Sequence, residues 1–392
     1  MQEKTKQEVK TERNRNIDII RALAILIILV YHIFAITNVK LVNGNLRYFV
    51  QYGGEYGVTV FFIISGFSIY KSLSRRKDNF KYGTFIKDRL KRILPQYYIS
   101  LIILILFTGS TVVLFSKEQI WNLLSHVFLA HGFFYSHQGS ISGVAWTLTP
   151  IFCFYLFAPL LFKCLEKKPK LTVCLSILVS CIIKAIIFNF LAKTNTQDAG
   201  IYFWLGRIFF CEIDEFVIGM FLAKSITTPE NNKDKKKLVI NILLILVSVV
   251  MLYLWIFVDK NKVGIITANT TRLSNCFEAY IWYSVLTIIL SLGIYGFSQI
   301  RINLENPVSK GLLNVAKHEY GIYIWHLEVI KYLSRTNPYM MELVGQGRRI
   351  VYVYLFIIAI AFGILMDVIV ESVDWEKQVS KIKSLINIKD KN

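Results

Sequence analysis

The chain has 392 residues, of which 54% are hydrophobic and 14% aromatic, and it carries a formal net charge of +19 with a mean hydropathy of +0.48. The apolar residues fall in repeated runs of about 20, the length that crosses roughly 30 Å of hydrocarbon. The composition therefore excludes an ordinary soluble domain. It predicts an all-α, polytopic transmembrane helical bundle.

About ten spans are expected along the chain. Lys and Arg are concentrated in the N-terminal tail, in alternate loops and in the C-terminal tail, so the positive-inside rule places both termini in the cytoplasm. The basic charge is thus a topology signal, and no nucleic-acid partner is expected. The predicted spans are residues 18–37, 57–73, 95–115, 144–162, 171–192, 207–223, 238–258, 278–298, 312–334 and 350–371.

This topology predicts one transmembrane domain, residues 18–372, between a cytoplasmic N-tail (1–17) and a short cytoplasmic C-tail (373–392). The first span lacks a small-residue cleavage site and is expected to be retained. The segment Gln119 to Phe134, "QIWNLLSHVFLAHGFF", is apolar but short for a full crossing. We expect it to be a re-entrant or interfacial helix on the outer side, against a wet vestibule.

The first span, "DIIRALAILIILVYHIFAI", carries Arg21 and His32. Eleven residues at 100° each make three turns plus about 20°, so the two side chains share one face and lie about 16 Å apart along the axis. Arg21 is placed near the cytoplasmic edge and His32 near the outer edge. Each has an ordinary explanation, snorkelling for Arg21 and a helix–helix hydrogen bond for His32. Their shared face favours a functional site, in which His32 is suited to accept a proton.

A second polar cluster, "FIKDRLKRILPQYY", opens the third span. Arg89 and Arg92 are i, i+3 neighbours and project from one face. They are either a positive-inside flank or a clamp for a phosphorylated ligand, since guanidinium groups bind phosphate oxygens in pairs. In the second span, Ser65 and Gly66 indicate close helix packing.

The ordered set of these motifs resembles the acyltransferase 3 family of membrane-bound acyltransferases. The resemblance rests on the R-x10-H pattern, on "GVTVFFIISGF" and on the R-x-x-R pair followed by Pro95 and Tyr98. It continues through three later segments and covers nearly the whole chain. Those segments are "AWTLTPIFCFYLFAPLL" with Trp146, Leu148, Phe154, Tyr155 and Pro159, then "DEFVIGMFLA" and "YGIYIWHLEVI" with His326.

One departure concerns the carboxylate that many members carry in the Trp146 span, where this chain has Ile151 and Phe152. Glu212, Asp214 and Glu215 are the candidates to replace it, and Glu212 and Glu215 share a helix face. The alternative is an internal pair between Arg207 and Asp214 that neutralises itself. Trp146, Tyr155 and His326 are further supporting candidates, and a packed or hydrogen-bonded role for His326 stays open.

The resemblance implies transfer of an acyl group, usually acetyl from acetyl-CoA or another acyl-CoA, to a hydroxyl of a cell-envelope, capsular or exopolysaccharide glycan or a lipid-linked saccharide. We expect Arg89, Arg92 and Arg21 to hold the coenzyme phosphates at the inner mouth. His32 would deprotonate the acceptor or carry the acyl group. The expected location is a bacterial plasma membrane, among membrane lipids. The oligomeric state stays open.

Two other classes of function compete with acyl transfer. A transporter or flippase for a lipid-linked saccharide would also place charges inside the membrane, but it does not explain the motif set. A membrane glycosyltransferase would need carboxylate-rich loops, which the sequence does not show. The six cysteines have no metal-ligand spacing, so neither a disulfide framework nor a metal site is expected.

Overall fold

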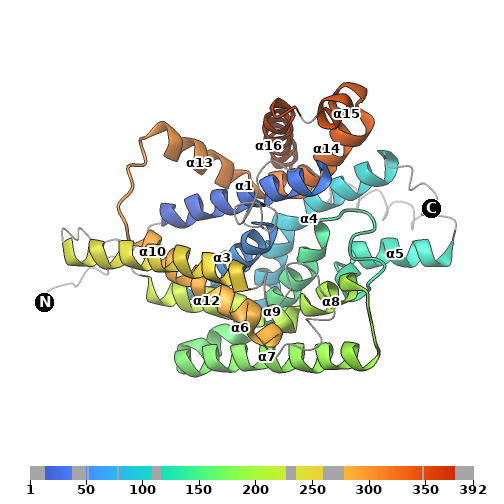
Figure 1. Ribbon diagram of the computed structural model, residues 1–392. Helices are drawn as coiled ribbons and strands as arrows, with labels where there is room; N and C mark the ends of the chain where they lie inside the picture. The colour runs from blue at the N-terminus through green and yellow to red at the C-terminus, as the bar shows by residue number, and fades with distance from the viewer. Residues whose placement is uncertain are drawn as a thin grey trace, which may run out of the picture.

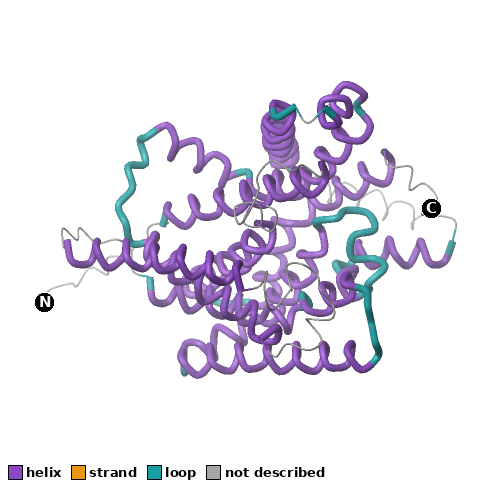
Figure 2. Tube along the Cα trace, viewed as in Figure 1, coloured by secondary structure: helices purple, strands orange, loops and turns teal. Residues whose placement is uncertain are grey.

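The computed structural model describes residues 14–37, 50, 53–76, 79–107, 116–226, 235–258, 278–346 and 348–375. Within these ranges the chain is helical, with connecting loops and no strand (Figure 2). The elements (Figure 1) are α1 (Arg15–Thr37), α3 (Gly53–Arg75), α4 (Tyr82–Phe107), α5 (Lys117–Val127), the 3-10 helices η3 (His131–Phe133) and η4 (Ala145–Thr147), α6 (Leu148–Lys167), α7 (Pro169–Lys193), α8 (Ala199–Gly206), α9 (Phe209–Ser225), α10 (Lys235–Val258), α12 (Glu278–Ser298), α13 (Pro307–Lys317), α14 (Glu319–Thr336), α15 (Pro338–Gly345) and α16 (Ile350–Glu371).

The predicted fold class, a polytopic transmembrane helical bundle, is confirmed. Eight helices among the described residues are long and apolar enough to cross a membrane, namely α1, α3, α4, α6, α7, α10, α12 and α16. Two of the ten predicted spans fall outside this set. The segment 207–223 forms α9, which has only 17 residues. The segment 312–334 is interrupted at His318, whose φ of −104° and ψ of 20° separate α13 from α14.

The third span also differs from its predicted bounds. Helix α4 begins at Tyr82, so the basic segment that holds Arg89 and Arg92 is helical and continuous with the span, and Pro95 lies inside the helix. The described part of α4 ends at Phe107, and the predicted end of this span lies outside the described residues. The N-tail up to residue 13, the C-tail from residue 376 and Cys276 lie outside them as well. The five described cysteines are free thiols.

The centre of the bundle is built on a close crossing of α3 and α9. A Cβ on Gly66 would overlap the carbonyl group of Phe216, and a Cβ on Gly219 would overlap that of Ile63. The two backbones therefore touch, as small residues allow between membrane helices. This confirms the packing predicted for Gly66. It also joins two of the motifs that carry the family resemblance.

Helix α1 packs against both α3 and α14, and α14 in turn packs against α16 beside the short α15 (Figure 1). The α14–α16 contact is again tight, because a Cβ on Gly321 would lie 2.5 Å from the carbonyl oxygen of Gly363. The face of α1 that carries Arg21 and His32 is thereby enclosed between two other helices. This arrangement positions the candidate site.

Candidate active site

A cavity of about 120 Å³ lies between α1, α3, α4, α6 and α14. Cationic side chains gather at one of its ends, and its other walls are largely apolar and aromatic. The lining residues are Arg21, Val58, Phe61, Phe62, Ile64, Ser65, Ser68, Ile69, Arg89, Arg92, Ile93, Thr147, Leu148, Ile151, Tyr155, Glu319, Tyr320 and Tyr323. Four of the predicted site residues, Arg21, Arg89, Arg92 and Tyr155, are thus brought into one cavity.

At the cationic end, Arg21 is held by partners on three helices. Its Nε lies 2.9 Å from a carboxylate oxygen of Glu319 in α14, and its Nη1 lies 3.7 Å from Asp18 one turn earlier. Its Nη2 donates to the hydroxyl of Ser68 in α3 at 3.0 Å. The residue is 9% exposed. This is a fixed, paired guanidinium inside the bundle, a different situation from a side chain that snorkels to headgroups.

Arg89 and Arg92 are placed differently from Arg21. Arg89 donates to the Ser72 hydroxyl at 2.9 Å and its guanidinium lies 5.5 Å from the Phe85 ring centre. The Arg92 side chain is 61% exposed, and its nearest carboxylate oxygen, on Glu319, is 3.9 Å away. The two arginines therefore supply the positive charge at the accessible rim of the cavity.

The far end of the cavity is closed by a hydrogen-bonded tyrosine. The Tyr323 hydroxyl lies 2.9 Å from Thr147 Oγ1 and donates to the carbonyl of Val144 at 3.0 Å. Its ring packs edge-on against Phe61 and lies 5.8 Å from the ring of His326. Tyr323 is therefore the wall between the cavity and the histidines beyond it.

His32 and His326 form a direct pair just past this wall. Nδ1 of His32 lies 3.1 Å from Nε2 of His326, and the ring centres are 4.9 Å apart. Since Arg21 also contacts α14, both residues of the first span face the same helix, as their spacing predicts. The cavity lining does not include either histidine.

The acids of α9 lie in a separate buried cluster. Arg207 Nη1 pairs with Glu212 at 3.0 Å and with Glu215 at 3.4 Å, and Glu215 also accepts from Thr59. All of these side chains are almost completely buried. Asp214, which the alternative interpretation paired with Arg207, is held by the Ser284 hydroxyl at 2.5 Å.

The spacing argument for an Arg207–Asp214 pair assumed one continuous helix. Arg207 instead follows α8, and Ile208 is extended with a φ of −69° and a ψ of 157° before α9 begins. Glu212 and Glu215 do share a face, and both reach the same guanidinium. The two carboxylates share one guanidinium, and the cluster does not line the main cavity. The Arg207 guanidinium does lie 5.5 Å from the Trp146 ring centre. Trp146 and Arg207 also border a narrow crevice with Gly132 and Trp204.

The segment predicted to be re-entrant or interfacial contains α5, a helix of only 11 residues. Its histidines fix the loop that leads to α6. His126 and His131 stack with ring centres 4.2 Å apart. Both are fully buried, and His131 Nε2 donates to the Ala145 carbonyl at 2.8 Å. The Tyr97 hydroxyl of α4 lies 2.9 Å from His126 Nδ1.

These histidines predict a loss of stability in mild acid. Burial lowers the pKa of His126 to about 3 and that of His131 to about 4, below the usual value of about 6.5. The unfolded segment therefore binds protons that the folded segment rejects, and stability falls as the pH drops below about 6.5. We expect the melting temperature to decline between pH 6.5 and 4.5. The decline should be shallower in His126→Phe/His131→Phe, and equal slopes in both proteins would contradict the assignment.

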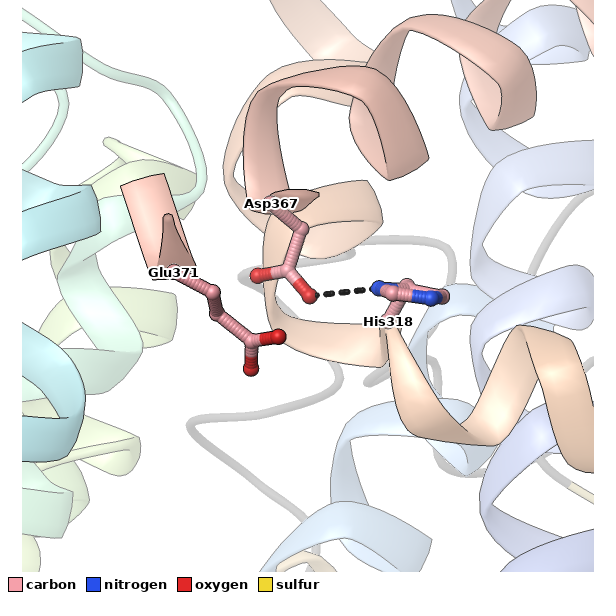
Figure 3. Close-up of side chains that lie close together, drawn as sticks. All are labelled: His318, Asp367 and Glu371. Carbon is pink, nitrogen blue, oxygen red and sulfur yellow. Dashed lines mark hydrogen bonds and ion pairs between the residues drawn. The ribbon is translucent and has the colours of Figure 1, made fainter. Parts of the chain in front are cut away.

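A third histidine cluster lies at the start of α14 and the end of α16 (Figure 3). His318 Nδ1 donates to Asp367 Oδ2 at 2.8 Å, and Glu371 follows one turn later on α16. The three donor atoms lie within 4.8 Å of one another, so a cation could use them. His318 and Asp367 already satisfy each other, and the group lies outside the cavity lining. We retain the expectation that the reaction uses no metal.

Two residues of the cavity, Glu319 and Tyr323, are not among the site residues that the sequence predicts. Glu319 immediately precedes the "YGIYIWHLEVI" motif, and Tyr323 lies within it one turn before His326. A carboxylate at the start of a predicted intramembrane motif was the available signal for Glu319. Asp18, three residues before Arg21, could have been found from the i, i+3 spacing alone.

The bundle thus holds one cavity lined by Arg21, Arg89 and Arg92, with a pair of histidines beyond its Tyr323 wall. The acyltransferase 3 family model, described as an acyltransferase domain, matches residues 14–369. The chain therefore belongs to the acyltransferase 3 family.

Several curated relatives of this chain are proteins of Staphylococcus aureus. "Putative O-acetyltransferase SACOL0978" of strain COL is 24% identical over 375 residues, which are 90% of this chain and 56% of the relative. O-acetyltransferase OatA of strain NCTC 8325 is 25% identical over 362 residues, which are 86% of this chain and 53% of the relative. The chain thus spans about half the length of the relatives it matches. No solved structure matches it.

Proposed function

We propose that the chain is an integral membrane O-acyltransferase of a bacterial plasma membrane. It moves an acetyl group from acetyl-CoA to a hydroxyl of a cell-envelope, capsular or exopolysaccharide glycan. Family membership supports the acyl-transfer chemistry, and the name O-acetyltransferase of two relatives supports acetyl as the group transferred.

The observation that carries the proposal is the cavity between the arginines and Tyr323. With both termini in the cytoplasm, its cationic rim faces the compartment that supplies acyl-CoA. Asp18 and Glu319 already balance Arg21, so Arg89 and Arg92 are the groups that attract the coenzyme phosphates. The apolar and aromatic walls suit the uncharged pantetheine arm, which brings the thioester toward Tyr323 and His32.

The chemical step follows from this order of groups. His32 takes the proton of the acceptor hydroxyl, and the oxygen attacks the thioester carbonyl carbon. The C–S bond breaks, the acetyl group stays on the acceptor oxygen, and the coenzyme leaves as the thiolate on the arginine side. In the alternative, His32 attacks the carbonyl carbon itself and passes the acetyl group on in a second step. Both routes need an unprotonated ring nitrogen on His32.

Removal of the rim arginines predicts a binding defect. Arg89→Gln/Arg92→Gln deletes two charge-assisted phosphate contacts, each worth about 1.5–3 kcal/mol. We expect the KM for acetyl-CoA to rise about 100-fold while kcat at saturation changes little. The matched control is Arg76→Gln, because Arg76 pairs with Asp88 at 2.9 Å and does not line the cavity. An unchanged KM in the double variant would show that Arg89 and Arg92 do not bind the coenzyme and serve only as a positive-inside flank of the span.

The function itself is tested by incubating the purified protein with acetyl-labelled acetyl-CoA and candidate glycans. We expect label on a glycan hydroxyl, and the position of the label identifies the acceptor. Movement of a lipid-linked saccharide across proteoliposomes without acetyl-CoA, and without label transfer, would instead establish a transporter or flippase.

A further inference from the structure

The backbone carbonyls around the histidine pair determine which ring nitrogens carry protons. Nδ1 of His326 lies 2.7 Å from the Tyr323 carbonyl oxygen and 3.2 Å from that of Ile322. A carbonyl oxygen only accepts, so this Nδ1 is the protonated nitrogen. In the neutral ring, Nε2 of His326 then has a lone pair, and it points at His32.

The same reasoning applies to His32. Its Nδ1 lies 3.0 Å from the Ile28 carbonyl oxygen and 3.1 Å from Nε2 of His326. Both neighbours are acceptors, so Nδ1 of His32 carries the proton and shares it between them. Neutral imidazole has one N–H, and the lone pair of His32 is therefore on Nε2.

We infer that His326 is a positioning residue that, together with the Ile28 carbonyl, holds His32 in the Nδ1–H tautomer and so keeps Nε2 as the reactive nitrogen. The role of Nε2 as the reactive nitrogen rests on the proposed function. The tautomer of His32 does not depend on that function. Among the residues that the structure describes, no carboxylate is bonded to either ring. A neutral histidine thus takes the position that an aspartate holds behind the base in a Ser-His-Asp triad.

His326 also stabilises the charged intermediate. When Nε2 of His32 takes the acceptor proton, the ring becomes imidazolium and its Nδ1–H bond to His326 becomes charge-assisted, about twice as strong as a neutral one. Around the pair, the Tyr31 ring lies edge-on to His32. Lys331, five residues after His326 on α14, is bound by Glu328 at 3.0 Å. This ion pair limits the repulsion that Lys331 exerts on the imidazolium.

Two substitutions of His326 separate this role from simple packing. In His326→Gln the side-chain oxygen can replace Nε2 as the acceptor that faces His32. In His326→Asn the shorter amide replaces only Nδ1, so no acceptor reaches His32. We expect kcat to fall about 100-fold in the Asn variant and less than about 10-fold in the Gln variant, with the KM for acetyl-CoA unchanged in both. The control is His318→Gln, which removes the buried histidine bound to Asp367 and should leave kcat unchanged.

The tautomer is tested without any activity measurement. In protein labelled with ¹⁵N-histidine, NMR should show His32 protonated at Nδ1 and unprotonated at Nε2. This population should be smaller in His326→Asn, where only the Ile28 carbonyl accepts from Nδ1, than in His326→Gln. An Nε2–H tautomer in the wild type, or equal kcat values in the two variants, would overturn the inference. A wild-type protein that transfers no acetyl group would instead overturn the proposed function and leave the tautomer standing.

Discussion

Replacing His32 with alanine is expected to reduce acetyl transfer by at least 100-fold and up to 10,000-fold, the contribution of a positioned general base. The imidazole is the group beyond Tyr323 whose Nε2 can take the acceptor proton or the acetyl group. Alanine removes that nitrogen and leaves Nε2 of His326 without its donor. His326 cannot replace it, because its Nε2 faces the Nδ1 side of His32 and not the side of the reactive Nε2.

The lower transfer rate of His32→Ala should come from a slower chemical step. Folding and acetyl-CoA binding should be unchanged. Arg21 lies about three helical turns from His32 on α1, and the cavity that it lines with Arg89 and Arg92 does not include His32. We therefore expect acetyl-CoA to bind His32→Ala with its wild-type affinity. Measured together, membrane insertion, donor affinity and transfer rate distinguish these cases. Full activity in a correctly inserted His32→Ala protein would remove His32 from the mechanism.

The largest effect on stability is expected at the crossing of α3 and α9. Gly66→Ala or Gly219→Ala places a methyl group against the backbone carbonyl of Phe216 or of Ile63. Backbone cannot move aside as a flexible side chain can, so the helices must separate. Overpacking of a core costs about 1–3 kcal/mol, and here we expect the upper end of that range or beyond. Melting temperature in detergent is the measurement.

The chain offers matched controls for this prediction. A Cβ on Gly83 of α4 or on Gly311 of α13 would meet nothing within 4 Å. Gly83→Ala and Gly311→Ala should therefore leave the melting temperature unchanged or raise it slightly, since alanine is the better helix former. Equal melting temperatures for Gly219→Ala and Gly311→Ala would show that the two helices do not touch as described.

Much of the fold follows from hydrophobic periodicity, because a span of about 20 apolar residues has few alternatives in a membrane. The failures lie where polar residues interrupt that pattern. The break at His318 is stabilised by a hydrogen bond to Asp367, a partner that only the tertiary structure brings near. Similarly, Ile208 is extended and separates Arg207 from the helix that carries the acids. The predicted shared face of Arg207 and Asp214 required one continuous helix and was therefore wrong.

The candidate site was predictable where it depends on one helix. The spacing of Arg21 and His32 places both on the face that meets α14. It could not reveal Glu319 as the partner of Arg21, or the bond between His32 and His326, because these contacts join residues almost 300 positions apart. The carboxylate missing from the Trp146 span is also not replaced in the cavity by Glu212 or Glu215, which pair with Arg207 behind it.

The most direct test of the central claim is a sided transfer measurement. Inverted bacterial membrane vesicles that contain the protein receive labelled acetyl-CoA outside, on the original cytoplasmic face, and hold the glycan acceptor inside. The proposed function, with the donor at the arginine rim on the cytoplasmic side and the acceptor at His32 beyond Tyr323, predicts labelled acetyl on the enclosed glycan, with no free acetyl-CoA in the lumen and no label in His32→Ala vesicles. Label found only on an acceptor added outside, with the donor, would contradict the account.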